Sequence, residues 1–107
     1  MLRRAAILIS ALLLSGQASG EVSPQRQREL LHLLRHDCGS CHGMTLKGGL
    51  GPPLLPQALA GKPPETLAAT ILYGRAATPM PPWRGILDED EVAWLVEQLR
   101  TGVADVR

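Results

Sequence analysis

Two cysteines and a histidine stand close enough in the sequence to act on a single cofactor. Cys38 and Cys41 are separated by two residues, and His42 follows the second cysteine directly. Cys-x-x-Cys-His is the sequence to which a c-type haem is attached: the thiols add to the two vinyl groups and the histidine binds one face of the iron. Because the chain has no further cysteine, no thiol remains for a structural disulfide. We therefore expect one covalent haem c here.

Two other uses of a cysteine pair fit this sequence less well. A thioredoxin-like Cys-x-x-Cys lies beside a βαβ pattern, and the sequence shows none. A structural zinc site needs four nitrogen or sulfur ligands, usually from two paired clusters, and a second cluster is missing. Haem attachment is the interpretation that uses all three residues.

Met80 is the candidate for the sixth iron ligand. It lies in the stretch 77–83, which reads Ala-Thr-Pro-Met-Pro-Pro-Trp. A thioether ligand favours ferrous iron, so that ligation by His42 and Met80 raises the reduction potential. The flanking prolines stiffen the loop and lower the entropy lost when the sulfur is held in place. Met44 is only two residues from His42 and is expected on the wrong side to compete.

A glycine-rich loop at 43–53 follows the histidine. Its glycines allow the backbone to pass close to a cofactor edge. A ligating histidine needs its other ring nitrogen fixed by a hydrogen bond, often to a backbone carbonyl. We expect a carbonyl near Gly51-Pro52 to accept that bond from His42.

Three helical stretches must position these loops. The first begins near Ser23-Pro24 and runs into the Cys-x-x-Cys-His segment, and the second follows Pro63-Pro64 and stops by Gly74. The third begins at Asp88, which with Glu91 forms a capping-box pattern, and it ends at Gly102. Its apolar residues recur at helical spacing, and no strand pattern appears. The fold class is predicted to be all-α, with about three main helices wrapped around the haem.

The first twenty residues read as a secretory signal peptide. A basic start is followed by a segment at 5–14 that is apolar apart from Ser10, and then by small residues suited to cleavage after Ala18 or Gly20. The apolar segment is about half of the roughly 20 residues that a membrane span needs. We therefore expect a cleaved signal at 1–20, a single domain at 21–107 and a periplasmic location, with an uncleaved anchor as the alternative.

The charge of the mature chain excludes some partners. Without Arg3 and Arg4 the chain has nine basic and ten acidic residues, a net charge near −1, so nothing indicates nucleic acid. Lys47, Lys62 and Arg75 flank the two loops and could steer an acidic protein, whereas Arg100 and Arg107 are expected at the far end of the last helix. His32 and His36 are expected to face solvent.

The order Cys38 to His42, then Gly51-Pro52, then Met80-Pro81, with helices before and after, resembles class I monohaem cytochromes c over essentially the whole mature chain. More narrowly, the wording of 42–52 and 59–64 resembles the NirC family, small cytochromes encoded beside the cytochrome cd1 nitrite reductase of denitrifying bacteria. The resemblance implies crossed first and last helices, an exposed haem edge and outer-sphere one-electron transfer.

Three functions remain open from the sequence. The first, which we favour, is a monomeric, non-enzymatic periplasmic electron carrier for the nitrite reductase system, with cytochrome cd1 as a redox partner. The second is an accessory cytochrome in haem d1 maturation, which would use the same redox site. The third is an open-site haem enzyme or gas sensor, which requires that Met80 does not bind iron.

Overall fold

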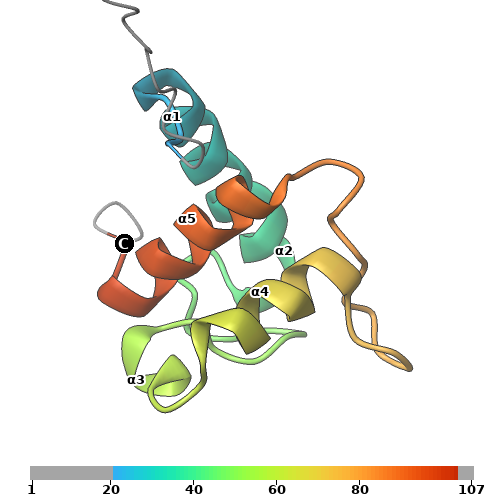
Figure 1. Cartoon of the computed structure of the whole chain (residues 1–107). Coiled ribbons are helices and arrows are strands. Elements are labelled where there is room, and N and C mark those ends of the chain that lie inside the picture. The colour runs from blue at the N-terminus through green and yellow to red at the C-terminus, as the bar shows by residue number, and fades with distance from the viewer. Residues whose placement is uncertain (1–20, 104–107) are drawn as a thin grey trace, which may run out of the picture.

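Helices follow one another through residues 21–103, the range that the computed structural model describes (Figure 1). No strand occurs in this range, so the all-α prediction is confirmed. None of its helices is long and apolar enough to cross a membrane. The expected signal peptide lies outside the described residues. The helices are α1 (Pro24–Leu33), the π-helical turn η1 (Leu34–Cys38), α2 (Gly39–His42), α3 (Pro56–Leu59), α4 (Pro64–Tyr73) and α5 (Glu89–Thr101).

The first helix begins as predicted and continues without a break into the haem motif. The Ser23 hydroxyl accepts a hydrogen bond from the Arg26 N–H at 3.2 Å, and Pro24 takes the first helical position. The sequence did not predict the widened π-helical turn between α1 and α2. Such turns are frequent at functional sites, and this one ends at Cys38 itself.

The last helix starts with the predicted capping box. The Asp88 carboxylate accepts from the Glu91 N–H at 2.8 Å, and the Glu91 carboxylate accepts from the Asp88 N–H at 3.0 Å. The helix ends before Gly102, as expected. Together these bonds satisfy two backbone donors that would otherwise lack partners at the helix start.

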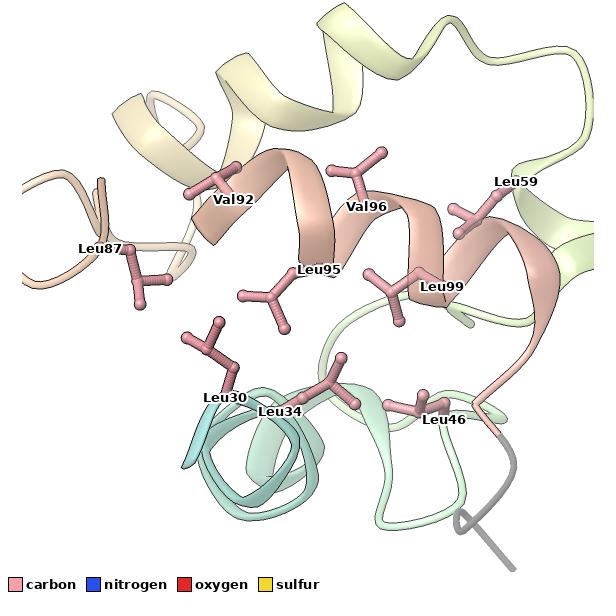
Figure 2. Packing of buried hydrophobic residues seen from close by; sticks show 9 residues of the cluster. All are labelled: Leu30, Leu34, Leu46, Leu59, Leu87, Val92, Leu95, Val96 and Leu99. Atoms are coloured by element: carbon pink, nitrogen blue, oxygen red, sulfur yellow. The ribbon is translucent and has the colours of Figure 1, made fainter. Parts of the chain in front are cut away.

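The core lies where α5 meets the other helices, and α1 crosses α5 as the resemblance to cytochromes c implied (Figure 1). Figure 2 shows Leu30 and Leu34 pointing toward Leu95 across this crossing. Because Leu34 is buried in the core, it fixes the start of the helical turn that ends at Cys38. The buried side chains are Leu30, Leu34, Leu46, Leu59, Leu87, Val92, Leu95, Val96 and Leu99.

Glu91 also joins the two crossing helices. Its second carboxylate oxygen accepts a hydrogen bond from the Arg26 guanidinium of α1, which is also paired with Glu29 at 2.8 Å. The Glu91 side chain is only 14% exposed, so this ion pair is less screened than a surface pair. The bond from Arg26 lowers the pKa of Glu91, an effect that burial partly opposes.

Replacing Glu91 should separate the two roles of this carboxylate. Glu91→Ala removes both the cap and the ion pair and should lower the free energy of unfolding by about 1 to 2 kcal/mol. Glu91→Gln can still cap and should cost less, about 0.2 to 1 kcal/mol. Glu89→Gln, in the same first turn, is the control and should cost almost nothing. Denaturant unfolding of the holoprotein measures all three.

The pH dependence of the Glu91→Gln effect follows from the sign of the pKa shift. A carboxyl whose pKa is lowered by folding stabilises the protein above its unfolded pKa of about 4.3 and loses that contribution as the pH falls through the lower folded value. The stability difference between wild type and Glu91→Gln should therefore be constant near neutral pH and shrink below about pH 4. A difference that grows on acidification would contradict the ion pair.

Candidate haem site

The two cysteines lie one helical turn apart on a continuous helical segment. Cys38 ends η1 and Cys41 lies in α2, so both side chains lie on the same side of the helix. Both residues are half-buried, with free thiols. Burial, together with the neighbouring Asp37 carboxylate, raises the pKa of Cys38 to about 11. Before haem is attached, the half-buried Cys38 side chain is therefore a neutral thiol at physiological pH.

The His42 ring is held in one orientation by the loop that follows it. Its Nδ1 lies 2.7 Å from the Pro52 carbonyl oxygen, which confirms the predicted acceptor region. Because a carbonyl can only accept, Nδ1 must carry the proton. Nε2 is then the nitrogen with a free lone pair, and this is the tautomer that a metal-binding histidine requires.

The loop reaches the ring because a glycine lies against it. A Cβ at Gly51 would lie 2.7 Å from the Nδ1 and Cε1 atoms of His42, well inside van der Waals contact. Two backbone bonds fold the loop back onto α2: Gly51 N–H donates to the Cys41 carbonyl at 2.7 Å, and Gly48 N–H donates to the His42 carbonyl at 2.8 Å. Gly51 is therefore needed because the loop backbone lies directly against the His42 ring. The sequence predicted only that the glycines let the loop pass close to a cofactor edge.

The Met80 backbone is fixed by hydrogen bonds that the sequence did not reveal. Its carbonyl accepts from the Arg75 N–H at 3.2 Å, and its N–H donates to the Thr78 hydroxyl at 3.3 Å. Gly74 has a φ of 70°, a backbone conformation that favours glycine. A Cβ at this position would also lie 2.6 Å from the Met80 carbonyl oxygen, so a larger residue would not fit. Threonine and glycine are both found in turns, so the sequence could have indicated a turn at Gly74 and at Thr78.

The Met80 loop is also tied to the helix before it. Trp83 N–H donates to the Ile71 carbonyl at 3.0 Å, and Arg84 N–H donates to the Leu72 carbonyl at 3.2 Å. The loop thus leaves the end of α4 and returns to it before the chain reaches α5 (Figure 1). The Met80 loop is therefore held by hydrogen bonds to backbone carbonyls at the end of α4 as well as by its prolines.

The donor set and its surroundings fit a large apolar cofactor. Two thiols, an imidazole with a fixed tautomer and a thioether are the groups that haem c uses. Leu50, in the 43–53 loop, is 79% exposed, and Tyr73, just before the Met80 loop, is 60% exposed. Isolated exposed apolar side chains are common on protein surfaces, so the fit to haem rests on the four donor groups.

The remaining predicted residues lie as follows. His32 and His36 are exposed, as expected. Met44 is 53% exposed. Lys47, Lys62 and Arg75 are exposed too. Arg100 lies in the last turn of α5, as expected. Lys62 lines a hollow of about 160 Å³ together with Arg100, because α3 packs on the end of α5. Arg107 lies outside the described residues.

Comparisons with known proteins identify cytochromes as relatives of this chain. The family described as "Cytochrome C oxidase, cbb3-type, subunit III" matches residues 25–98. A cytochrome c55X of Pseudomonas aeruginosa is 57% identical over 89 residues, which are 83% of this chain and 75% of that protein. The solved structure of a c-type cytochrome NirC matches with a TM-score of 0.75 and 57% identity, covering 77% of this chain and 96% of that one.

A longer enzyme is similar as well. The dihydro-heme d1 dehydrogenase of Pseudomonas aeruginosa is 38% identical over 93 residues, which are 87% of this chain but 17% of that enzyme. The similarity thus covers one part of the larger protein.

The helical fold, the Cys-x-x-Cys-His segment and these matches define a c-type cytochrome, an electron-transfer protein that carries covalently bound haem c. Within that class the chain belongs to the matched cbb3-type subunit III family and, more narrowly, to the cytochromes c55X. The resemblance to NirC seen in the sequence is confirmed.

Substituting Gly51 should disturb the histidine. Gly51→Ala places a methyl group against the His42 ring, and overpacking of this kind costs about 1 to 3 kcal/mol. We expect a lower free energy of unfolding and a smaller haem-loaded fraction of the purified chain. Gly85→Ala is the matched control, because a Cβ there meets nothing within 4 Å. Equal behaviour of the two variants would show that the close approach to His42 has no structural consequence.

Proposed function

We propose that the protein is a periplasmic one-electron carrier whose haem is bound by Cys38 and Cys41 and ligated by His42 and Met80. The observation that carries the proposal is the hydrogen bond from His42 Nδ1 to the Pro52 carbonyl at 2.7 Å. It leaves Nε2 as the coordinating atom, directly after the cysteine pair. No catalytic residue is assigned.

Each group has a distinct part in electron transfer. The haem, when bound, supplies an iron that accepts and returns one electron. His42 supplies a fixed neutral imidazole, and Met80 supplies a soft sulfur that favours the reduced state. The bonds of Thr78 and Arg75 to the Met80 backbone limit movement of the loop that carries the thioether. Little rearrangement then accompanies each transfer.

Export belongs to the same proposal. Residues 1–20 have the layout of a cleaved signal peptide, and the domain at 21–107 would be released into the periplasm. The cleavage site is after Ala18 or Gly20. The mature domain acts as a monomer, as expected for a small carrier that must meet two partners in turn.

The partner we propose is cytochrome cd1 nitrite reductase, in denitrification. Support comes from the similarity to NirC and to cytochromes c55X. The similarity to part of a dihydro-heme d1 dehydrogenase favours a second function, in which the cytochrome accepts or delivers electrons during haem d1 maturation. Both functions use the same redox centre, and they differ in the protein that docks on it.

The Met80 assignment is tested by substitution. Met80→Ala should remove the weak sulfur-to-iron charge-transfer band at the red end of the ferric spectrum, lower the reduction potential and let carbon monoxide bind the ferrous haem. Met44→Ala, which changes an exposed methionine on the other loop, should alter none of these. A wild-type protein that is high-spin and binds carbon monoxide readily would instead support the open-site enzyme or sensor.

The docking face is tested by charge reversal at matched positions. Transient redox complexes depend on charge mainly through the encounter rate. Lys47→Glu, in the 43–53 loop, should slow electron transfer to cytochrome cd1 at low ionic strength, and the difference should fade near 0.1 M salt, where the Debye length is about 10 Å. Arg28→Glu makes the same change in net charge at an exposed position of α1 that belongs to neither loop, and it should have less effect.

The outcomes separate the two functions. Equal rates for Lys47→Glu and Arg28→Glu would reject this docking face. If wild-type protein transfers no electron to cytochrome cd1, the maturation function is the better account, and a strain without the cytochrome should then accumulate reductase lacking haem d1.

A further inference from the structure

Two imidazole rings lie side by side on the surface, apart from the haem ligands. His32 lies in the last turn of α1, and His36 lies in η1, four residues further on. Their ring centroids are 4.2 Å apart, with the planes inclined by 44°. Both residues are exposed to solvent. The ring contact therefore places two imidazole groups on one face.

We propose that His32 and His36 form a surface site for a divalent transition-metal ion of borderline softness, with Zn²⁺ as the probe. Histidines at i and i+4 on a helix can ligate one zinc ion, with zinc–nitrogen distances of about 2.0–2.1 Å. Rings already in contact need only small side-chain rotations to aim one nitrogen each at the same point. Water would complete the coordination shell.

The composition makes this pair the natural imidazole site of the holoprotein. The chain has three histidines and two cysteines, and the haem takes His42 and both cysteines. Within residues 21–103 there is no group of three or more potential histidine, cysteine or carboxylate ligands. Glu29, one turn before His32, is already paired with Arg26. The pair is thus a two-ligand site, open to water or to a ligand from another molecule.

Metal binding here would act on the segment that leads to the haem. An ion held by both side chains links α1 to the π-helical turn, whose last residue is Cys38. Since the unfolded chain does not hold the two rings at this separation, binding stabilises the folded state by mass action. The thermal midpoint of the holoprotein should rise with the zinc concentration.

The experiment uses untagged holoprotein and calorimetric titration with Zn²⁺. We expect one site in the wild type. His32→Gln and His36→Gln should each weaken binding roughly tenfold or more, because the second ligand then no longer adds its effective concentration. The double variant should lose the site and the zinc-dependent rise of the thermal midpoint. Ca²⁺, which prefers oxygen ligands, should not bind at this pair.

Two results would overturn the proposal. One is a double variant that binds Zn²⁺ as tightly as the wild type, which would place the ion elsewhere, such as at the haem propionates. The other is a wild type whose thermal midpoint does not change at zinc concentrations that saturate the titration. Glutamine preserves size and polarity at these exposed positions, so the variants should fold like the wild type.

Discussion

The orientation of a single imidazole ring is the constraint on which the rest of the site depends. His42 follows Cys41 directly, so a haem bound to the cysteines leaves the ring little freedom of position, and only its rotation remains to be fixed. The Pro52 carbonyl fixes it through a bond of 2.7 Å to Nδ1, and Gly51 makes room for that approach. The 43–53 loop therefore sets the orientation of the His42 ring, although none of its own residues is a proposed iron ligand.

The core and the site are connected by continuous backbone. Leu30 and Leu34 are buried in the crossing with α5, and η1 carries the chain from Leu34 to Cys38 without leaving helical structure. On the other side, α4 packs on α5 and supplies the carbonyls that hold the base of the Met80 loop. The helix α5 thus supports both the Cys-x-x-Cys-His segment and the Met80 loop, the first through α1 and the second through α4.

Much of this organisation could be predicted from the sequence, because it depends on local signals. The cap at Ser23, the capping box at Asp88 and the stops at Gly74 and Gly102 were read correctly, as was the acceptor near Pro52. Features that depend on tertiary contact could not be predicted. The π-helical turn leaves no periodic signal, and the Arg26–Glu91 pair joins residues far apart in the chain. The position of Arg100 beside Lys62 follows from packing of α3 on α5, and α3 itself is too short to give a pattern.

Covalent attachment of haem to Cys38 and Cys41 can be read from the mass of the denatured mature holoprotein after acidic organic extraction. We expect that the haem stays with the polypeptide, that the mass equals the chain cleaved after Ala18 or Gly20 plus one haem, and that neither thiol reacts with an alkylating reagent. Free haem in the organic phase, with a polypeptide of unmodified mass and two reactive thiols, would contradict it.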